Sequence, residues 1–446
     1  MKQFACHPCG LIFRCLSLLI FTAVLLSACG NNGGQTLSVS DENAFSPTED
    51  FSSVGTLEYL PLQLGSDGFS DDRGFYRILP NKDASNTLSF IDYASQQETV
   101  VCNRPECTHS DETCTAWLPY SGGAMLVIPV GKKLVYLYGG NPNFFDELGA
   151  NASARLETSD LNGVNRKAHH VFNATTTIGV GLGTMRHGFA KDDRYLYFLA
   201  QNYRGKNEDF KLVQLLCAFD SIEGCVYQLA ELDTTARIVG AYDGKLVLDS
   251  CPNAVSIQNE AGGLTAQLTL FSLADFSQTP VASYPFTSQG ACREDQFYSL
   301  NADGRLETVF LVNGEKKILG DVFPGRDMQM FRVIGFVENL LFVQEDHTIQ
   351  DGETVVSNRF LHAINVSDAS VQDVPFFYSG YEKNRYPYQV IAQIEENYLV
   401  VMDETERSVE VPQMGTVNAP TRVYGMIRCE DFWNGQDTFQ IIHAVN

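Results

Sequence analysis

The feature that most constrains the fold of this chain is a loop-and-strand motif that recurs seven times. Each unit begins with a short loop containing Asp, Gly or Asn and continues as a strand rich in Tyr, Phe, Val and Leu. One apolar marker residue per unit gives steps of 60, 61, 50, 51, 44 and 58 residues. The markers are Tyr76, Tyr136, Tyr197, Val247, Tyr298, Phe342 and Val400.

A second strand follows each first strand, as in TLSFIDYAS (residues 87–95). A period of roughly 40 to 60 residues built from four short strands is typical of a β-propeller blade, and blades bury a continuous core only when they stack around an axis. We therefore predict an all-β chain whose residues 55–446 form a single β-propeller domain of seven blades, with six or eight blades as alternatives. A two-sheet β-sandwich or two smaller β domains are the competing architectures. We expect residues 56–65 to complete the last blade and close the ring.

The first residues have the pattern of an export signal. Residues 1–28 combine Lys2 and Arg14 with the apolar stretch LSLLIFTAVLL, which is too short to span a bilayer comfortably. The stretch ends in LSAC (residues 26–29), which resembles the lipobox of bacterial lipoproteins. That resemblance implies that Cys29 receives a diacylglyceryl group and becomes the first residue of the mature chain. The competing interpretation is an ordinary secretory signal with an incidental cysteine.

Residues 29–54 are rich in Gly, Asn, Ser and acids, which is typical of a flexible tether. Removal of the signal, which holds two basic and no acidic residues, reduces 31 basic side chains to 29 against 54 acidic ones, a formal charge of −25. Such a charge opposes binding to nucleic acid or to bare anionic lipid. We expect an extracytoplasmic monomer that is held to the membrane by lipidated Cys29 and that binds an unidentified protein or glycan.

The densest group of metal-binding residue types is CNRPECTHSDETC (residues 102–114), with the spacing C-x4-C-x-H-x4-C. Three thiolates and one imidazole are a known tetrahedral zinc set. Four protein ligands fill the coordination shell, so a zinc ion here would be structural and would leave no position open for catalysis. The candidate ligands are Cys102, Cys107, His109 and Cys114.

Oxidation offers a second interpretation, because cysteines outside the cytoplasm tend to form disulfides. Eight cysteines follow Cys29, and three cysteines in one loop cannot all pair locally. The cluster is therefore a zinc site, or a disulfide with a spare thiol or a distant partner, with a catalytic role as a third alternative. Cys217 and Cys225 flank AFDSIEG, a plausible strand–turn–strand, and are candidates for a disulfide across that hairpin.

Together with the lipobox and the propeller-like repeats, the pattern Cys-Asn-x-Pro-x-Cys-x-His resembles a group of uncharacterised lipoproteins of gut-dwelling Gram-positive bacteria. The resemblance implies secretion and a propeller fold, and it brings no activity with it. The matching residues are Cys102, Asn103, Pro105, Cys107, His109 and Cys114.

Signatures of catalysis are missing from the sequence, which contains no G-x-S-x-G, no H-E-x-x-H and no G-K-[ST] loop. We therefore assign no catalytic residue and expect a cell-surface lipoprotein whose propeller is a binding or scaffolding module. The alternative is an extracytoplasmic carbohydrate-active enzyme, a glycoside hydrolase or lyase, with paired carboxylates contributed by several blades at the axis. A structural protein of the envelope is a third possibility.

Overall fold

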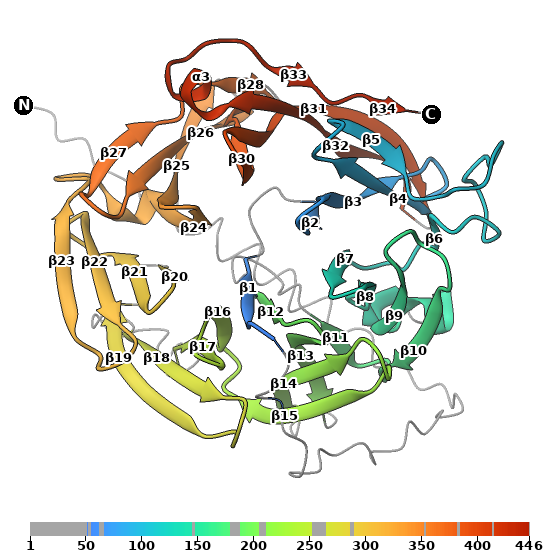
Figure 1. Cartoon of the computed structure of the whole chain (residues 1–446), viewed down its shortest axis with the longest axis horizontal. Coiled ribbons are helices and arrows are strands. Elements are labelled where there is room, and N and C mark those ends of the chain that lie inside the picture. Colours follow the sequence, from blue (N-terminus) through green and yellow to red (C-terminus); the bar gives the residue numbers. More distant parts are fainter. Residues whose placement is uncertain are drawn as a thin grey trace, which may run out of the picture. The chain divides into compact units, whose positions relative to one another are not determined.

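The computed structural model describes residues 51–445, apart from 52–54, 62–66, 145–147, 179–187, 205–210, 252–264, 286–289, 352–353, 381–383 and 413. The predicted signal, Cys29 and nearly all of the predicted tether lie outside the described residues. Within the described part, seven sheets of mainly antiparallel strands follow one another along the chain, and Figure 1 shows them as blades around a central axis. The described fold is an all-β propeller of seven blades, which confirms the prediction from the repeat.

The first three blades are built mainly from consecutive strands. Blade 1 consists of β2 (Gly68–Ser70), β3 (Gly74–Pro80), β4 (Asn86–Asp92) and β5 (Gln97–Val100), with β6 (Trp117–Leu118) also paired to β4. Blade 2 consists of β7 (Met125–Val130), β8 (Lys133–Tyr138), β9 (Arg155–Asp160) and β10 (Lys167–Val171), and between β8 and β9 lie η1 (Pro142–Phe144) and η2 (Gly149–Ala152). Blade 3 consists of β12 (Phe189–Lys191), β13 (Tyr195–Arg204), β14 (Lys211–Asp220) and β15 (Val226–Leu232), with β11 (Thr176–Ile178) also paired to β13.

The remaining four blades repeat the same order from the axis outward. Blade 4 consists of β16 (Arg237–Tyr242), β17 (Lys245–Ser250), β18 (Thr265–Ser272) and β19 (Gln278–Pro285). Blade 5 consists of β20 (Gly290–Arg293), β21 (Gln296–Leu300), β22 (Arg305–Phe310) and β23 (Lys316–Asp321), and η4 (Met328–Met330) follows it. Blade 6 consists of β24 (Phe331–Val337), β25 (Leu340–Asp351), β26 (Thr354–Asn365) and β27 (Ser370–Asp373), with β29 (Arg385–Pro387) and β28 (Phe377–Ser379) added. Blade 7 consists of β30 (Gln389–Ile394), β31 (Asn397–Val411), β32 (Gly415–Arg428) and β33 (Gln440–Ile441), and the helix α3 (Cys429–Trp433) follows β32.

The hydrophobic core is divided among the interfaces between blades. Each of the seven clusters of buried apolar residues in the described chain joins neighbouring blades; six join two blades, and the cluster of blades 2 and 3 also includes Phe69 of blade 1. Successive residues of a strand point to opposite faces of the sheet, so a central strand serves two interfaces. On β25, Leu341 and Val343 pack toward blade 5, whereas Phe342 between them packs toward blade 7. This two-sided burial explains the nearly continuous apolar runs that mark the repeat, and all seven marker residues are buried.

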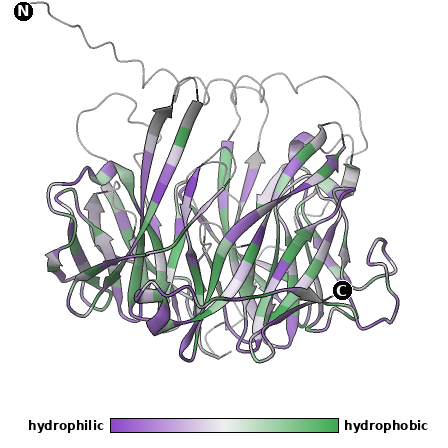
Figure 2. Ribbon diagram, turned by 90° about the horizontal axis from the view of Figure 1, so that it is seen from above, coloured by the Kyte–Doolittle hydropathy of each residue, from purple (hydrophilic) through white to green (hydrophobic). Residues whose placement is uncertain are grey.

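The two faces of the ring carry connections of different length. The first and second strands of each blade are joined by short turns, such as Asp243 and Gly244, whose φ angles of 48° and 67° are those of the turns that favour a hairpin. Connections on the opposite face are often longer, as between β17 and β18 or between β5 and β7. Figure 2 shows hydrophobic residues along the strands and hydrophilic residues at many of the turns.

The ring closes between blades 7 and 1 in a way that the sequence did not predict. The strand β34 (Ala444–Val445) pairs in parallel with β5, adding an outer strand to blade 1. At the same seam, Arg77 lies 3.0 Å from the Asp67 carboxylate and covers the ring of Tyr424, whose hydroxyl donates to Asp67. The pairing of β34 and the contacts of Tyr424 with Asp67 and Arg77 therefore hold the first and last blades together.

The expectation that residues 56–65 complete the last blade is wrong. The strand β1 (Glu58–Leu60) pairs instead with β12, the innermost strand of blade 3. A Cβ atom at Gly188 would lie 2.3 Å from the ring of Tyr59, so the absence of a side chain at this position makes room for β1. Phe51, which the sequence places in the tether, is only 2% exposed and packs against Tyr195, so the packed body already includes residue 51.

Candidate metal centre and axial cavity

The Cys/His cluster lies on a loop inserted into the outer edge of blade 1. The strand β5 ends at Val100, and β6 returns to pair with the other end of β4, at Asn86 and Thr87. The intervening residues therefore leave the edge of the sheet and come back to it, and Figure 1 shows this loop extending beyond the strands of the ring. Such a loop has little core of its own, and a bound ion would hold it in place.

The four ligand atoms of the cluster converge. The sulfur atoms of Cys102, Cys107 and Cys114 and a ring nitrogen of His109 all lie within 4.8 Å of one another. The Nδ1 atom of His109 is 3.2 Å from the Cys114 sulfur. A tetrahedral ion with Zn–S bonds near ~2.3 Å needs sulfur atoms about 3.8 Å apart, so the cluster has the size of such a shell. The chain thus holds a Cys3His cluster that can bind a metal ion, with Cys114 buried and the other three half-buried.

The loop is built to present these ligands. Glu106 and His109 adopt φ angles of 60° and 54°, a left-handed conformation that is uncommon for residues other than glycine and that bends the chain around the cluster. The Asp111 carboxylate accepts hydrogen bonds from the backbone N–H and the hydroxyl of Thr113, at 2.9 and 2.6 Å. The Arg104 guanidinium donates to the Thr113 carbonyl oxygen. These bonds cross-link the loop independently of its cysteines.

Neighbouring donors stabilise negative charge on the sulfur atoms. Burial alone would raise the pKa of Cys102, but hydrogen bonds from the Arg104 backbone N–H and the Thr115 hydroxyl help to lower it. The Ala116 backbone N–H donates to the Cys114 sulfur at 3.3 Å, although burial raises the pKa of this thiol to about 12. Hydrogen bonds of this kind from neighbouring groups to sulfur orient thiolate ligands toward a metal.

Blade 2 contacts both ends of this loop. The Arg166 guanidinium of blade 2 donates to the Trp117 carbonyl oxygen of β6 at 2.7 Å. A Cβ atom at Gly163, whose φ is 81°, would lie 2.9 Å from the Val101 carbonyl oxygen, so the turn of blade 2 approaches the loop closely. The loop that carries the Cys/His cluster (residues 101–116, here called the metal loop) therefore forms part of the seam between blades 1 and 2.

The structure does not bring the two candidate disulfide cysteines together. In the register of β14 and β15, Cys217 lies opposite Gln228, and the Asp220 N–H donates to the Cys225 carbonyl oxygen. Cys225 is therefore level with Asp220, three residues along β14 from Cys217. Its side chain accordingly points to the opposite face of the sheet from that of Cys217. Cys217 is buried and Cys225 exposed, and both are free thiols. Burial raises the pKa of the Cys217 thiol to about 12, so this residue behaves as a small apolar core residue.

A cavity of about 260 Å³ lies at the axis of the propeller. Its wall comes from the innermost strands of blades 4, 5 and 6 together with β1, the strands that surround the axis in Figure 1. Two of these strands contain a β-bulge beside the cavity, at Val239 and at Ile334. Bulges often occur next to binding sites because they redirect side chains. The polar lining groups include Tyr59, Arg237, Cys292 and Glu294.

A buried ion pair supports the wall of this axial cavity. Arg237 bonds to Asp249, and the side chain of Asp249 is fully buried. The Tyr284 hydroxyl donates to the same carboxylate, and burial raises the pKa of this tyrosine well above its ordinary value. Burial likewise raises the pKa of the Cys292 thiol, which opposes a role as nucleophile. The sequence analysis did not identify this ion pair. The one sequence signal for it is Asp249, an acidic residue that interrupts the apolar run KLVLDS of β17.

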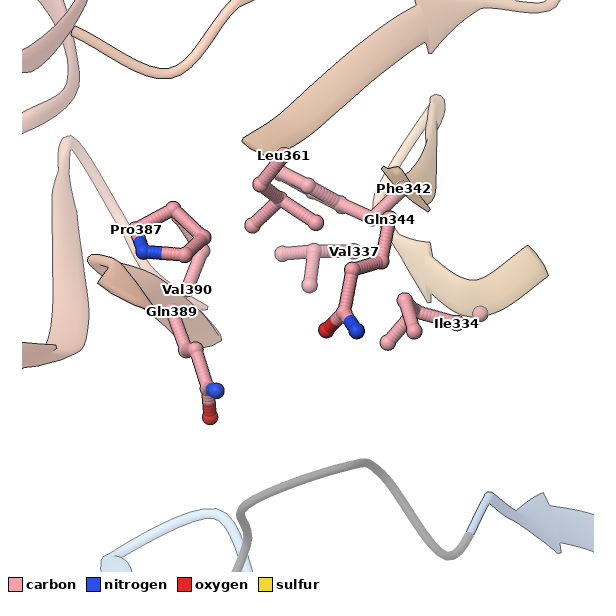
Figure 3. A pocket seen from close by; sticks show the side chains of 9 residues that line it. Ile334, Val337, Phe342, Gln344, Leu361, Pro387, Gln389 and Val390 are labelled. Carbon is pink, nitrogen blue, oxygen red and sulfur yellow. The ribbon is translucent and has the colours of Figure 1, made fainter. Parts of the chain in front are cut away.

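A smaller cavity between blades 6 and 7 has a volume of about 20 Å³ (Figure 3). It is lined mainly by apolar side chains, including Val337, Phe342 and Leu361. The Gln389 side-chain oxygen beside it has no hydrogen-bond partner among the described residues. This volume has room for about one water molecule and is too small for a ligand.

No protein-family model and no curated protein matches this chain. Among solved structures, the β-propeller domain of the Trilobed protease from Pyrococcus furiosus is similar at 10% identity and a TM-score of 0.44, over 83% of this chain and 93% of that one. An oligogalacturonate lyase in complex with manganese is similar at 10% identity and a TM-score of 0.41, over 81% of this chain and 83% of that one. Pyrococcus horikoshii acylaminoacyl peptidase matches at 10% identity and a TM-score of 0.46, over 86% of this chain and 52% of that one, so the chain spans about half the length of the peptidase. At 10% sequence identity these similarities concern the fold alone and say nothing of the activity of this chain.

Proposed function

We propose that the chain is a lipoprotein of the cell exterior whose propeller is a binding module, and that a polar group of its protein or glycan partner enters the axial cavity. The observation that carries this proposal is the cavity itself, a hollow of about 260 Å³ with a buried arginine in its wall. Ligand pockets commonly combine an apolar lining with a few convergent polar groups. The longer connections on one face of the ring would surround the partner, because loops on a rigid scaffold usually carry the contacts.

We further propose that the Cys3His cluster holds a structural zinc ion. Soft thiolate ligands with one imidazole favour zinc among the common divalent ions. Cys102, Cys107, His109 and Cys114 would bind the ion, which would supply charge compensation and a fixed geometry for the loop. The membrane anchor through Cys29 is a part of the proposal that rests on the sequence alone.

The alternative of a carbohydrate-active enzyme has weaker support at the axis. A glycoside hydrolase needs two carboxyl groups on either side of the scissile bond. Among the described residues that line the axial cavity, Glu294 is the one acid. Asp249 lies behind the wall, where its carboxylate is held by Arg237 and Tyr284. The binding module therefore agrees better with the site.

The proposal is tested by titrating the full chain with a panel of glycans and short peptides while new reducing ends are measured. We expect saturable binding without turnover, and binding should be lost in Ala241→Phe, because this residue lines the cavity and a phenyl ring would fill it. The exposed Ala274→Phe is the matched control and should bind normally. New reducing ends would support the enzyme instead, and binding that survives Ala241→Phe would remove the axial cavity from the proposal.

A further inference from the structure

A second hollow lies outside the axis, at the seam of blades 1 and 2. It is a groove of about 640 Å³, and its lining combines the first turns of both blades with the beginning of the metal loop. Val100, Val101, Cys102 and Asn103 all belong to its wall. Because Cys102 is also a ligand of the Cys3His cluster, the wall of the groove and the metal centre share one segment of backbone.

The groove has an apolar floor. Phe90, Val100 and Leu161 are half-buried and line it together with the deeply buried Tyr76. The rings of Tyr76 and Phe90 pack with their centroids 4.5 Å apart, so the floor is rigid on the side of blade 1. Half-buried apolar side chains in a hollow of this size are suited to receive an apolar group from a partner.

The rim of the groove carries two ion pairs and one further basic side chain. Lys132 is exposed and has no ion-pair partner among the described residues. The Arg73 guanidinium is held in place by Asp71 and by the Tyr76 hydroxyl, both at 2.7 Å, and still exposes about half of its side chain. The one acid in the lining, Asp160, is already engaged by Lys133 at 2.7 Å. Because Arg73 is paired with Asp71 and Asp160 with Lys133, Lys132 is the uncompensated charge of the rim, in a chain with a formal charge of −23.

We infer that this groove binds an acidic peptide segment of a partner protein, with an apolar side chain of the peptide on the floor and its carboxylates at Lys132 and Arg73. An acidic segment is favoured because its carboxylates complement the positive charges of Lys132 and Arg73. The aliphatic surface of Val100 and Leu161 suits an apolar side chain of a peptide. This part rests on the proposed zinc ion, which Cys102 and the other three ligands would hold and which would fix the segment from Val101 to Asn103 as the wall of the groove.

The experiment is a selection from a displayed library of short random peptides, using the full chain with added zinc. Enriched peptides should combine Asp or Glu with an aliphatic or aromatic residue. Their affinity should fall about tenfold in Lys132→Glu and should weaken as the ionic strength rises. Lys317→Glu, which makes the same charge change at an exposed position of blade 5, is the matched control and should bind like the wild type.

Two further measurements complete the test. Chelation of the metal should weaken the selected peptides while the circular dichroism of the β-sheets is unchanged, and retained affinity would overturn the role of the ion. Ala241→Phe should bind the peptides normally, because the groove is distinct from the axial cavity. Absence of enrichment, insensitivity to Lys132→Glu, or Lys132-dependent binding of uronic-acid oligosaccharides in place of peptides would overturn the peptide groove.

Discussion

The buried ion pair behind the axial cavity allows a quantitative prediction. The substitution Asp249→Asn keeps the shape of the side chain but removes the buried negative charge that bonds to Arg237, which is 7% exposed. Removal of one partner of a buried ion pair typically costs about 3 to 5 kcal/mol of unfolding free energy. Because Arg237 borders a cavity that water can enter, we expect the lower end of this range, about 3 kcal/mol. With an unfolding entropy of about 2 cal/mol/K per residue over the described body, this loss corresponds to a fall of about 4 °C in Tm.

Thermal and urea unfolding of the full chain, followed by circular dichroism, measure this effect. The double variant Arg237→Met with Asp249→Leu should recover most of the lost stability, because a well-packed apolar pair often replaces a buried ion pair without cost. The control is Glu231→Gln, which breaks the exposed pair with Lys211 and should cost at most about 0.5 kcal/mol. A loss below about 1 kcal/mol in Asp249→Asn, or a double variant no better than the single one, would refute the reasoning.

Three further predictions address the metal centre, the acid stability and the anchor. Mass spectrometry of the purified chain should find one zinc ion per chain, which Cys107→Ser should lose; no metal together with few free thiols would favour disulfides. Burial alone would raise the pKa of Asp220, but hydrogen bonds from Arg194 and from backbone N–H groups lower it. The ionised carboxylate therefore stabilises the fold above the unfolded pKa of about 3.9, and this contribution is lost as the pH falls through the lower folded value. Asp220→Asn should accordingly be less stable than the wild type near neutral pH, and urea titrations should show the difference shrinking below pH ~4; a constant difference would contradict the assignment. Cys29→Ser should release the chain to the medium or leave it unprocessed, and unchanged membrane retention would remove the lipobox from the proposal.

The sequence by itself determined the blades. Each blade is built mainly from four antiparallel strands that follow one another along the chain, so alternation, turn residues and spacing are all readable along one stretch of sequence. The marker residues are buried in second strands, as Tyr136 is on β8 and Val400 on β31, because a strand packed on both faces must be apolar at every position. The Cys/His cluster was equally readable, since its four candidate ligands lie within thirteen consecutive residues.

Only the tertiary structure decided how the ends of the chain and the axis are used. The strand β1 is short, and its pairing with β12 depends on the space left by Gly188, which no local pattern reveals. The closing strand β34 is equally short and meets β5 from the far end of the sequence. The residues that line the axial cavity belong to blades separated by tens of residues in the sequence. Each blade contributes a few of them, such as Arg237 from blade 4 and Glu294 from blade 5. Periodicity encodes which face of a strand is buried, whereas a shared site at the axis exists only once the ring has closed and brought distant strands together.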